Sequence, residues 1–314
     1  MQLATIVRHD ELRPAMAIGD DILDFRAAAK ILPHCKRVAN SMFEIVSGGD
    51  EVVRLLQDIA GQVAGHEISL RDAGALVPVA ETKFAAPLPN PGMVLSIGAN
   101  YHEHLREMNT VAPETPMGFY KSVASIIGHG DAIILPASNP DMVDWEGEFS
   151  VVIGRPCHHV NEAESLDYVA GYTIINDVSA RDWVAPAFNA QGMIGQIVAW
   201  EHNILGKLFP TFCPMGPYIV TADEISNPDN LRLETRLNGI VMQSSNTSDL
   251  VFNVPKIIAY YSQFIQFRPG DIITTGSPSG VGYGRDPKLF MKPGDVVEVE
   301  IEGLGTLRND IGGA

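Results

Sequence analysis

The sequence predicts an α+β fold that is mainly β, with a small N-terminal domain ahead of a larger one. Its 314 residues exceed the usual length of a single domain. The apolar runs do not alternate regularly with long helices, which disfavours doubly wound and barrel α/β folds. Runs of strand length occur in the second part around 93–98, 131–135, 147–154, 169–176, 217–221 and 271–275.

The N-terminal domain is predicted to be a set of short strands followed by a helix. Residues 2–25 have the pattern of strands around a turn at Gly19-Asp20. Apolar residues recur at helical spacing from Val52 to Val63, and Asp50 is placed to cap that helix. The three prolines of residues 84–92 favour an extended connector. We therefore predict domains at residues 1–86 and 87–314.

Two further elements stand out in the larger domain. Asn238-Gly239 lies between two alternating runs within residues 231–243, which predicts a β-hairpin. A helix is expected from Val254 to Phe267, ended by the Arg-Pro-Gly sequence at 268–270. The chain shows no internal repeat.

Composition excludes several classes of partner. The chain has 22 Lys+Arg against 38 Asp+Glu, a formal charge of −16, and no basic block, so nucleic acid and anionic membrane surfaces are not expected partners. An anionic ligand would need local cations, which draws attention to Lys121, Arg181 and Lys207. Three widely spaced cysteines, with neither a leader-like N-terminus nor a membrane-spanning apolar run, lead us to expect a cytoplasmic protein.

Glu146 and Glu148 stand one residue apart at the start of a predicted strand. Side chains at i and i+2 of a strand share one face about 7 Å apart. Two carboxylates brought to about 4 Å repel by about 4 kcal/mol at an effective dielectric near 20, so a cation or a shared proton is expected if they are buried. A solvent-exposed strand edge is the alternative.

Asp177 ends another apolar strand and would add a third carboxylate. Three hard oxygen donors suit Mg²⁺, Mn²⁺ or Ca²⁺, whereas zinc is disfavoured because the set contains neither His nor Cys. The alternative role for Asp177 is to cap a short helix.

His104 and Glu107 would share a face if their segment is helical. The segment is not a His-Glu-x-x-His zinc motif, because Arg106 occupies the position of the second histidine. The glutamate would then hold an imidazole that takes a proton from water. An ordinary surface helix explains the same spacing, and both interpretations stay open.

Residues 271–284 form a Gly- and Ser-rich segment after a strand. Arg285 replaces the last glycine of a dinucleotide fingerprint, and Pro278 replaces the serine of a Gly-x-Ser-x-Gly motif. The segment is therefore either a donor-rich loop able to bind a carboxylate or a plain series of turns.

Taken in order, these motifs resemble the fumarylacetoacetate hydrolase family over roughly residues 92–312. They are Asn-Tyr-x-x-His-x-x-Glu, Glu-x-Glu before Val-Val-Ile-Gly, Asn-Asp-Val-Ser-Ala-Arg-Asp, Thr-Gly-Ser-Pro-x-Gly-Val-Gly and Lys-Pro-Gly-Asp. The resemblance implies a mixed β-roll core, usually in a homodimer, with one divalent ion. The matching metal ligands are Glu146, Glu148 and Asp177, with Mg²⁺ or Mn²⁺ as the expected ion and Ca²⁺ as a further candidate.

The resemblance also implies roles for other residues. His104 and Glu107 match a water-activating pair on a mobile lid, and Lys207 matches a lysine near the metal. Four residues match substrate-binding positions: Arg181, Lys121, Ser277 and Tyr101. The chain departs from the family pattern by an insertion within Pro186–Asn203 and by Val184 in place of a frequent glutamine. Gln191 and Gln196 are candidates to supply that amide.

The activity implied is metal-dependent hydrolysis of a C–C bond in a 2,4-dioxo acid. An acylpyruvate such as fumarylpyruvate or maleylpyruvate would give pyruvate and a carboxylic acid, in catabolism of aromatic or related compounds. The substrate partner would be a small anionic 2-oxo acid. The same scaffold also supports decarboxylation, isomerisation and hydration of 2-oxo acids, and a non-catalytic dicarboxylate binder is an alternative of another class. An intact His104–Glu107 pair favours hydrolysis.

Overall fold

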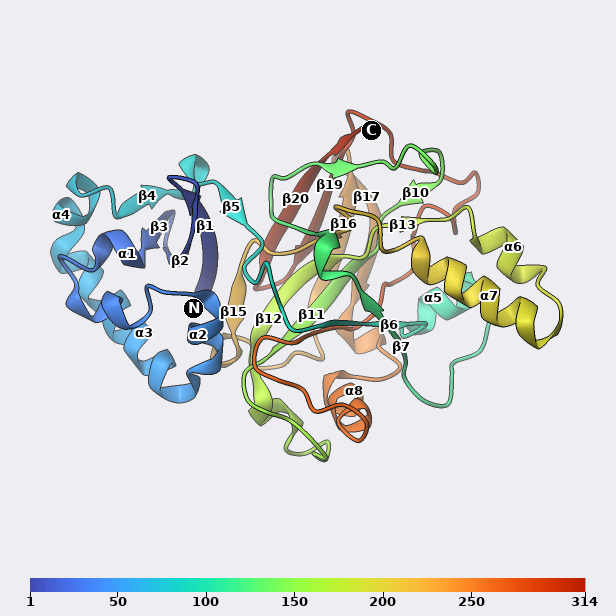
Figure 1. Ribbon diagram of the computed structural model, residues 1–314, viewed down its shortest axis with the longest axis horizontal. Helices are drawn as coiled ribbons and strands as arrows, with labels where there is room; N and C mark the ends of the chain where they lie inside the picture. The colour runs from blue at the N-terminus through green and yellow to red at the C-terminus, as the bar shows by residue number, and fades with distance from the viewer. Residues whose placement is uncertain (314) are drawn as a thin grey trace.

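The computed structural model describes residues 1–313, apart from the side chain of residue 188. It confirms an α+β architecture in which strands and helices are mixed (Figure 1). The N-terminal part is a strand meander covered by helices. Its elements are β1 (Gln2–Arg8), β2 (Glu11–Ile18), β3 (Asp21–Asp24), α1 (Phe25–Ala28), α2 (Met42–Ser47), α3 (Gly49–Val63), α4 (Glu67–Asp72), β4 (Leu76–Pro78) and β5 (Phe84–Ala85).

One sheet runs through both parts of the chain. Its order is β4-β3-β2-β1-β15-β12-β11-β18-β6-β7, with β5 paired to β1. The strands from the larger part are β6 (Val94–Gly98), β7 (Met117–Lys121), β11 (Gly147–Ile153), β12 (Val169–Asn176), β15 (Ile219–Thr221) and β18 (Ile272–Thr274). Antiparallel pairing of β1 with β15 joins the two parts, and the boundary between residues 86 and 87 stays a prediction.

A second sheet packs near the first, in the order β17-β16-β19-β20-β9 (Figure 1). Its strands are β9 (Ile133–Ile134), β16 (Arg232–Leu237), β17 (Ile240–Asn246), β19 (Val296–Ile301) and β20 (Gly305–Gly312). One hydrophobic cluster joins Phe149 and Val151 of β11 to Leu233 of β16 and Val299 of β19. Every residue of β11 is buried, which explains its continuous apolar run. Burial of the strand also holds Glu146 and Glu148, at its start, in place.

Short pairings complete the larger part. They are β8 (Ile126–Ile127) with β14 (Cys213–Pro214), and β10 (Val143–Asp144) with β13 (Ser179–Ala180). The predicted hairpin is confirmed, because Asn238 and Gly239 connect β16 to β17 with φ of 52° and 77°. Positive φ at both central residues is what a tight turn of this kind requires.

Two local predictions are wrong. Asp50 does not cap α3, whose N-cap is Gly48; its carboxylate instead pairs with Arg155 at 2.7 Å. The helix that starts at Val254, α8 (Val254–Tyr261), ends six residues before Phe267. Phe267 instead pairs with Cys157 as an isolated bridge. The helix α3 thus begins one residue before Asp50, and α8 ends before the segment that pairs with Cys157.

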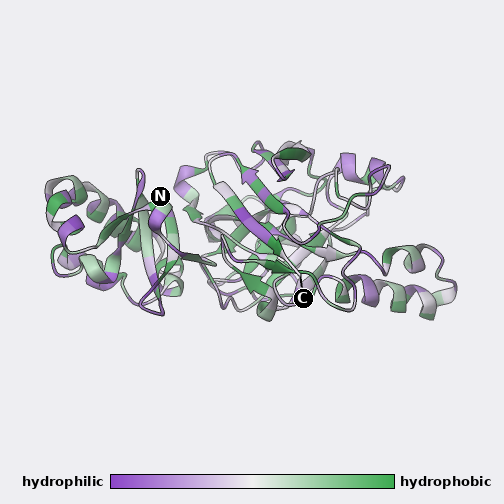
Figure 2. Ribbon diagram, turned by 90° about the horizontal axis from the view of Figure 1, so that it is seen from above, coloured by the Kyte–Doolittle hydropathy of each residue, from purple (hydrophilic) through white to green (hydrophobic). Residues whose placement is uncertain are grey.

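The remaining helices are α5 (His102–Glu107), α6 (Val184–Phe188) and α7 (Gly192–Leu205). The segment in which an insertion is predicted, Pro186–Asn203, lies within the stretch formed by α6 and α7, which project from one end of the molecule (Figures 1 and 2). No residue of α7 is buried, and Met193, Ile194 and Ile197 are exposed. None of the helices in residues 1–313 combines the length and apolar character needed to cross a membrane.

Candidate active site

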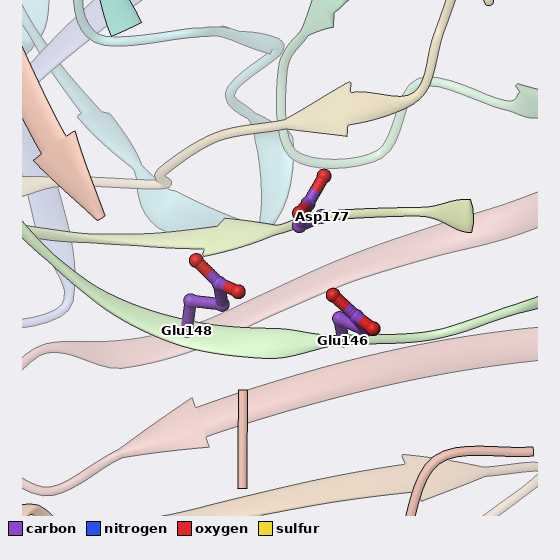
Figure 3. A group of neighbouring side chains, drawn as sticks. All are labelled: Glu146, Glu148 and Asp177. Carbon is purple, nitrogen blue, oxygen red and sulfur yellow. The ribbon is translucent and has the colours of Figure 1, made fainter. Parts of the chain in front are cut away.

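Three carboxylates converge at one end of β11 and β12. Glu146 immediately precedes β11, Glu148 is its second residue, and Asp177 immediately follows β12. The strands are antiparallel, Gly147 lies opposite Asn176, and the amide of Asp177 donates to the carbonyl of Glu146 at 2.8 Å. The side chains consequently gather at one place (Figure 3). One oxygen from each lies within 4.8 Å of the others, and all three residues are buried.

Two lysines form ion pairs with the carboxylates of this group. The Nζ of Lys207 lies 2.7 Å from both Glu146 Oε2 and Asp177 Oδ2, and 2.8 Å from the hydroxyl of Ser179. Lys121 Nζ donates to Asp177 Oδ1 and to the carbonyl of Lys207. Asp177 therefore has two cationic partners and no helix-capping role, so its alternative interpretation is excluded.

Arg181 extends the network to a fourth acid. Its Nε lies 2.7 Å from Asp144 Oδ1, and its Nη2 donates to Glu146 Oε1. Asp144 is fully buried in β10, and its other oxygen accepts from the amide of Tyr283 at 2.8 Å. Paired backbone strands β10 and β13 thus hold the arginine between two carboxylates.

Glu146 and Glu148 are one residue apart but have opposite electrostatic environments. Burial opposes ionisation of Glu146, yet Lys207 and Arg181 outweigh it and hold its pKa well below the ordinary value. Burial, reinforced by the charges of Asp177 and Glu146, raises the pKa of Glu148 well above the ordinary value. Glu148 accepts a hydrogen bond from the hydroxyl of Thr274, a neutral donor.

The residues present fit a divalent cation. Four buried acids (Asp144, Glu146, Glu148 and Asp177) face three buried cations (Lys121, Arg181 and Lys207), which leaves one negative charge uncompensated when all are ionised (4 − 3 = 1). Three hard oxygen donors within 4.8 Å of one another match the preference of Mg²⁺, Mn²⁺ and Ca²⁺. The structure therefore supports a divalent ion without distinguishing among these three.

His104 and Glu107 form a hydrogen-bonded pair on α5. Their side chains are one helical turn apart, with Nδ1 of His104 lying 2.8 Å from Oε2 of Glu107. The second oxygen of Glu107 accepts from the amide of Gly280 at 3.0 Å, so the glycine-rich loop also holds the pair. Engagement of Nδ1 leaves Nε2 as the ring nitrogen that can exchange a proton with a ligand. Both side chains are largely covered, unlike those of an ordinary surface helix.

A cavity of about 640 Å³ joins the acids to the pair. Its lining includes all three acids of the predicted metal site and both members of the His–Glu pair. The other predicted residues that line it are Lys207, Arg181 and Ser277. The Ser277 hydroxyl accepts from the side-chain amide of Gln243 at 2.9 Å. The cavity volume suits a small ligand.

Two predicted substrate-binding residues lie outside the lining of this cavity. Lys121 is buried behind Asp177, and Tyr101 is fully buried, where burial raises the pKa of its hydroxyl. Of the two candidate amides, Gln196 on α7 lines the cavity, whereas Gln191 does not. Lys121 thus pairs with Asp177 instead of facing the cavity. Through Gln196, α7 contributes to the cavity wall.

Several contributing residues had no predicted role. Asp144 anchors Arg181, and Trp200 and Lys288 line the cavity. Asp144 carried a usable signal, since it lies two residues before Glu146 and continues the alternation of acids at positions 144, 146 and 148. Lys288 follows the glycine-rich segment and had no local signal that would place it there.

Comparison with known proteins supports this description. The model of the fumarylacetoacetate hydrolase C-terminal domain matches residues 93–312. Oxaloacetate tautomerase YisK of Bacillus subtilis is 35% identical over 318 residues, covering 99% of this chain and 100% of the relative. The mitochondrial oxaloacetate tautomerase Fahd2a of Rattus norvegicus is 44% identical over 236 residues, covering 75% of this chain and 71% of the relative.

A solved structure shows a related metal complex. Maleylpyruvate hydrolase from Sphingobium sp. SYK-6, in complex with manganese(II) and pyruvate, is 27% identical and superposes with a TM-score of 0.70, covering 100% of both chains. The homodimer implied by the resemblance stays a prediction. The family match over most of the chain, with the full-length relative, shows that this protein belongs to the fumarylacetoacetate hydrolase family.

Proposed function

We propose that the protein catalyses keto–enol tautomerisation of a small 2-oxo dicarboxylic acid such as oxaloacetate. The observation that carries the proposal is the placement of the His104–Glu107 pair in the same cavity as the three acids. It puts a proton-transfer group beside a site suited to a 2-oxo acid. Similarity to an oxaloacetate tautomerase along the full chain favours this isomerase reaction over the C–C hydrolysis expected from the motifs.

Tautomerisation moves a proton between C3 and the 2-oxo oxygen without breaking a C–C bond. In the proposed reaction, Nε2 of His104 removes the C3 proton while the C2–C3 double bond forms and the electron pair of the carbonyl moves to oxygen. Glu107 stabilises the imidazolium through Nδ1. The imidazolium of His104 then gives this proton to the enolate oxygen, which completes the enol and restores neutral His104.

The developing negative charge requires cationic stabilisation. Lys207 is held beside Glu146 and Asp177 and lines the cavity, so its positive charge can stabilise the enolate through space. A divalent ion held by Glu146, Glu148 and Asp177 would, when bound, supply Lewis-acid polarisation of the 2-oxo group. The C3 proton has to meet His104, which places the reacting carbon between the pair and the acids.

The test is to add enol oxaloacetate, prepared in an aprotic solvent, to the protein with Mg²⁺ or Mn²⁺. Loss of enol absorbance faster than the spontaneous rate, matched by faster supply of the keto form to malate dehydrogenase, is the expected result. No acceleration over buffer would overturn the proposal, as would release of pyruvate and carbon dioxide from oxaloacetate as the main reaction. His104→Ala protein serves as the control for non-specific catalysis.

Acylpyruvate hydrolysis is the second candidate. The similar maleylpyruvate hydrolase supports it, and the same His–Glu pair could activate water. Maleylpyruvate and fumarylpyruvate should be supplied in parallel, with pyruvate detected by lactate dehydrogenase. Pyruvate release from either, at a specificity constant above that for oxaloacetate tautomerisation, would make hydrolysis the main activity.

A further inference from the structure

Three lysine or arginine side chains line the active-site cavity, and they differ in their partners. Arg181 is paired with Asp144 and Glu146, and Lys207 with Glu146 and Asp177. Within residues 1–313, Lys288 has no carboxylate partner within ion-pair distance, although the chain carries an excess of acidic residues. Its positive charge is therefore available to a ligand in the cavity.

Lys288 is nevertheless held in place. Its Nζ lies 3.2 Å from the centroid of the Tyr283 ring and donates to the carbonyl of Tyr283 at 2.9 Å. An aromatic face and a carbonyl orient an ammonium group without neutralising it, and the remaining N–H groups can still donate. The amide of Tyr283 is itself fixed by Asp144 at 2.8 Å, so the lysine belongs to the same framework as Arg181.

We propose that Lys288 binds the distal carboxylate of the substrate and makes the cavity selective for 2-oxo dicarboxylic acids over monocarboxylic ones. This inference rests on the proposed function and names the residue that recognises the second carboxylate of its substrate. The 2-oxo acid end would lie at the three acids and their ion, and the second carboxylate would lie toward Lys288.

Much of the remaining cavity wall is apolar. Met108, Met117, Phe119 and Val184 present apolar surface, and Glu107 is already engaged by His104 and Gly280. A carboxylate held against the apolar part of the wall would lose solvation, and the neutral amides of Gln196 and Asn203, which also line the cavity, would return less than a charged partner. Lys288 supplies that partner, because a hydrogen bond to a charged group contributes more than a neutral one.

The experiment compares oxaloacetate with its 4-methyl ester, which keeps the 2-oxo acid and the C3 protons but removes the distal charge. For Lys288→Met we expect KM for oxaloacetate to rise by about tenfold with kcat nearly unchanged. The preference for oxaloacetate over the ester should disappear. Lys288→Arg should retain most of the preference, and Lys292→Met, at an exposed position on the same segment, should behave as wild type.

A binding measurement separates this inference from the proposed function. Calorimetric titration of the Mg²⁺- or Mn²⁺-supplemented protein compares 2-oxoglutarate with 2-oxopentanoate, which replaces the distal carboxylate by a methyl group. Preference for 2-oxoglutarate in wild type, lost in Lys288→Met, supports the assignment even if no tautomerisation is detected. Equal binding of both acids by wild type, or an unchanged preference in Lys288→Met, overturns it even if the enzyme is an active tautomerase.

Discussion

The Nδ1 atom of His104 lies 2.8 Å from the Oε2 atom of Glu107, on a single turn of α5. The other oxygen of Glu107 is held by the amide of Gly280, which belongs to a segment more than 170 residues later in the chain. A short helix and a distant loop therefore fix the same carboxylate. The imidazole is oriented before a ligand arrives, which lowers the reorganisation needed for proton transfer.

Replacing His104 should remove the base without disturbing the fold. We expect His104→Ala to lower kcat by about 10²- to 10⁴-fold, the usual contribution of a general base, with a smaller change in KM. Steady-state assays of enol loss measure both constants. His102→Ala is the matched control, because His102 is an exposed residue of the same helix. Equal kcat values in the two variants would contradict a proton-transfer role.

Metal binding should stabilise the fold through Glu148. Saturation to a hundredfold above Kd adds about 2.7 kcal/mol to the free energy of unfolding. We expect Mg²⁺ or Mn²⁺ to raise the melting temperature of wild type and chelation by EDTA to reverse it. Glu148→Gln removes one of three oxygen ligands and should abolish the response. Glu162→Gln, at an exposed position, should keep it; a response retained in Glu148→Gln would exclude this site.

Gly280 is required for two separate reasons. Its φ is +97°, and a Cβ there would lie 2.1 Å from the carbonyl oxygen of Met242. Gly294 has a similar φ of +92° but open space around the Cβ position. Gly294→Ala should therefore cost about 1–3 kcal/mol from backbone strain alone, and Gly280→Ala should cost more. Urea unfolding measures both free energies, and equal losses would show that the contact with Met242 relaxes.

The thiols should be inert in the folded protein. Burial raises the pKa of Cys35 and of Cys213 to about 12, and that of Cys157 to about 11. The thiolate is the reactive form, so little of it exists at about pH 8. A chromogenic disulfide reagent should react with three thiols after denaturation and with almost none before it. Rapid labelling of native protein would show that one of these sites opens.

Local patterns accounted for several of the strands and for the hairpin. The strand runs and the Asn238-Gly239 hairpin were predictable because side-chain alternation and turn conformations are local properties. The end of α8 was not predictable, because Phe267 forms an isolated bridge with Cys157, more than 100 residues earlier, instead of continuing the helix. Asp50 was not a cap, because α3 begins at Gly49 and Asp50 is its second residue.

Within the site, too, local patterns were predictable and long-range contacts were not. Glu146 and Glu148 were predictable as a pair because strand geometry puts alternate side chains on one face. Asp144 continues the alternation of acids, but its pairing with Arg181, like the position of Lys288 in the cavity wall, depends on which side chains the fold brings together. Tyr101 and Lys121 match substrate-binding positions of the family, yet the structure places both outside the cavity lining.

The sequence by itself determined the family, the α+β class and the three acids that can hold an ion, because these depend on residue type, spacing and order. Only the tertiary structure decided how the charges are shared. Lys207 and Arg181 come from different segments to meet Glu146, while Glu148 faces the neutral hydroxyl of Thr274. Electrostatic interactions act through space, so the partners of a buried charge are known only when distant segments are packed together.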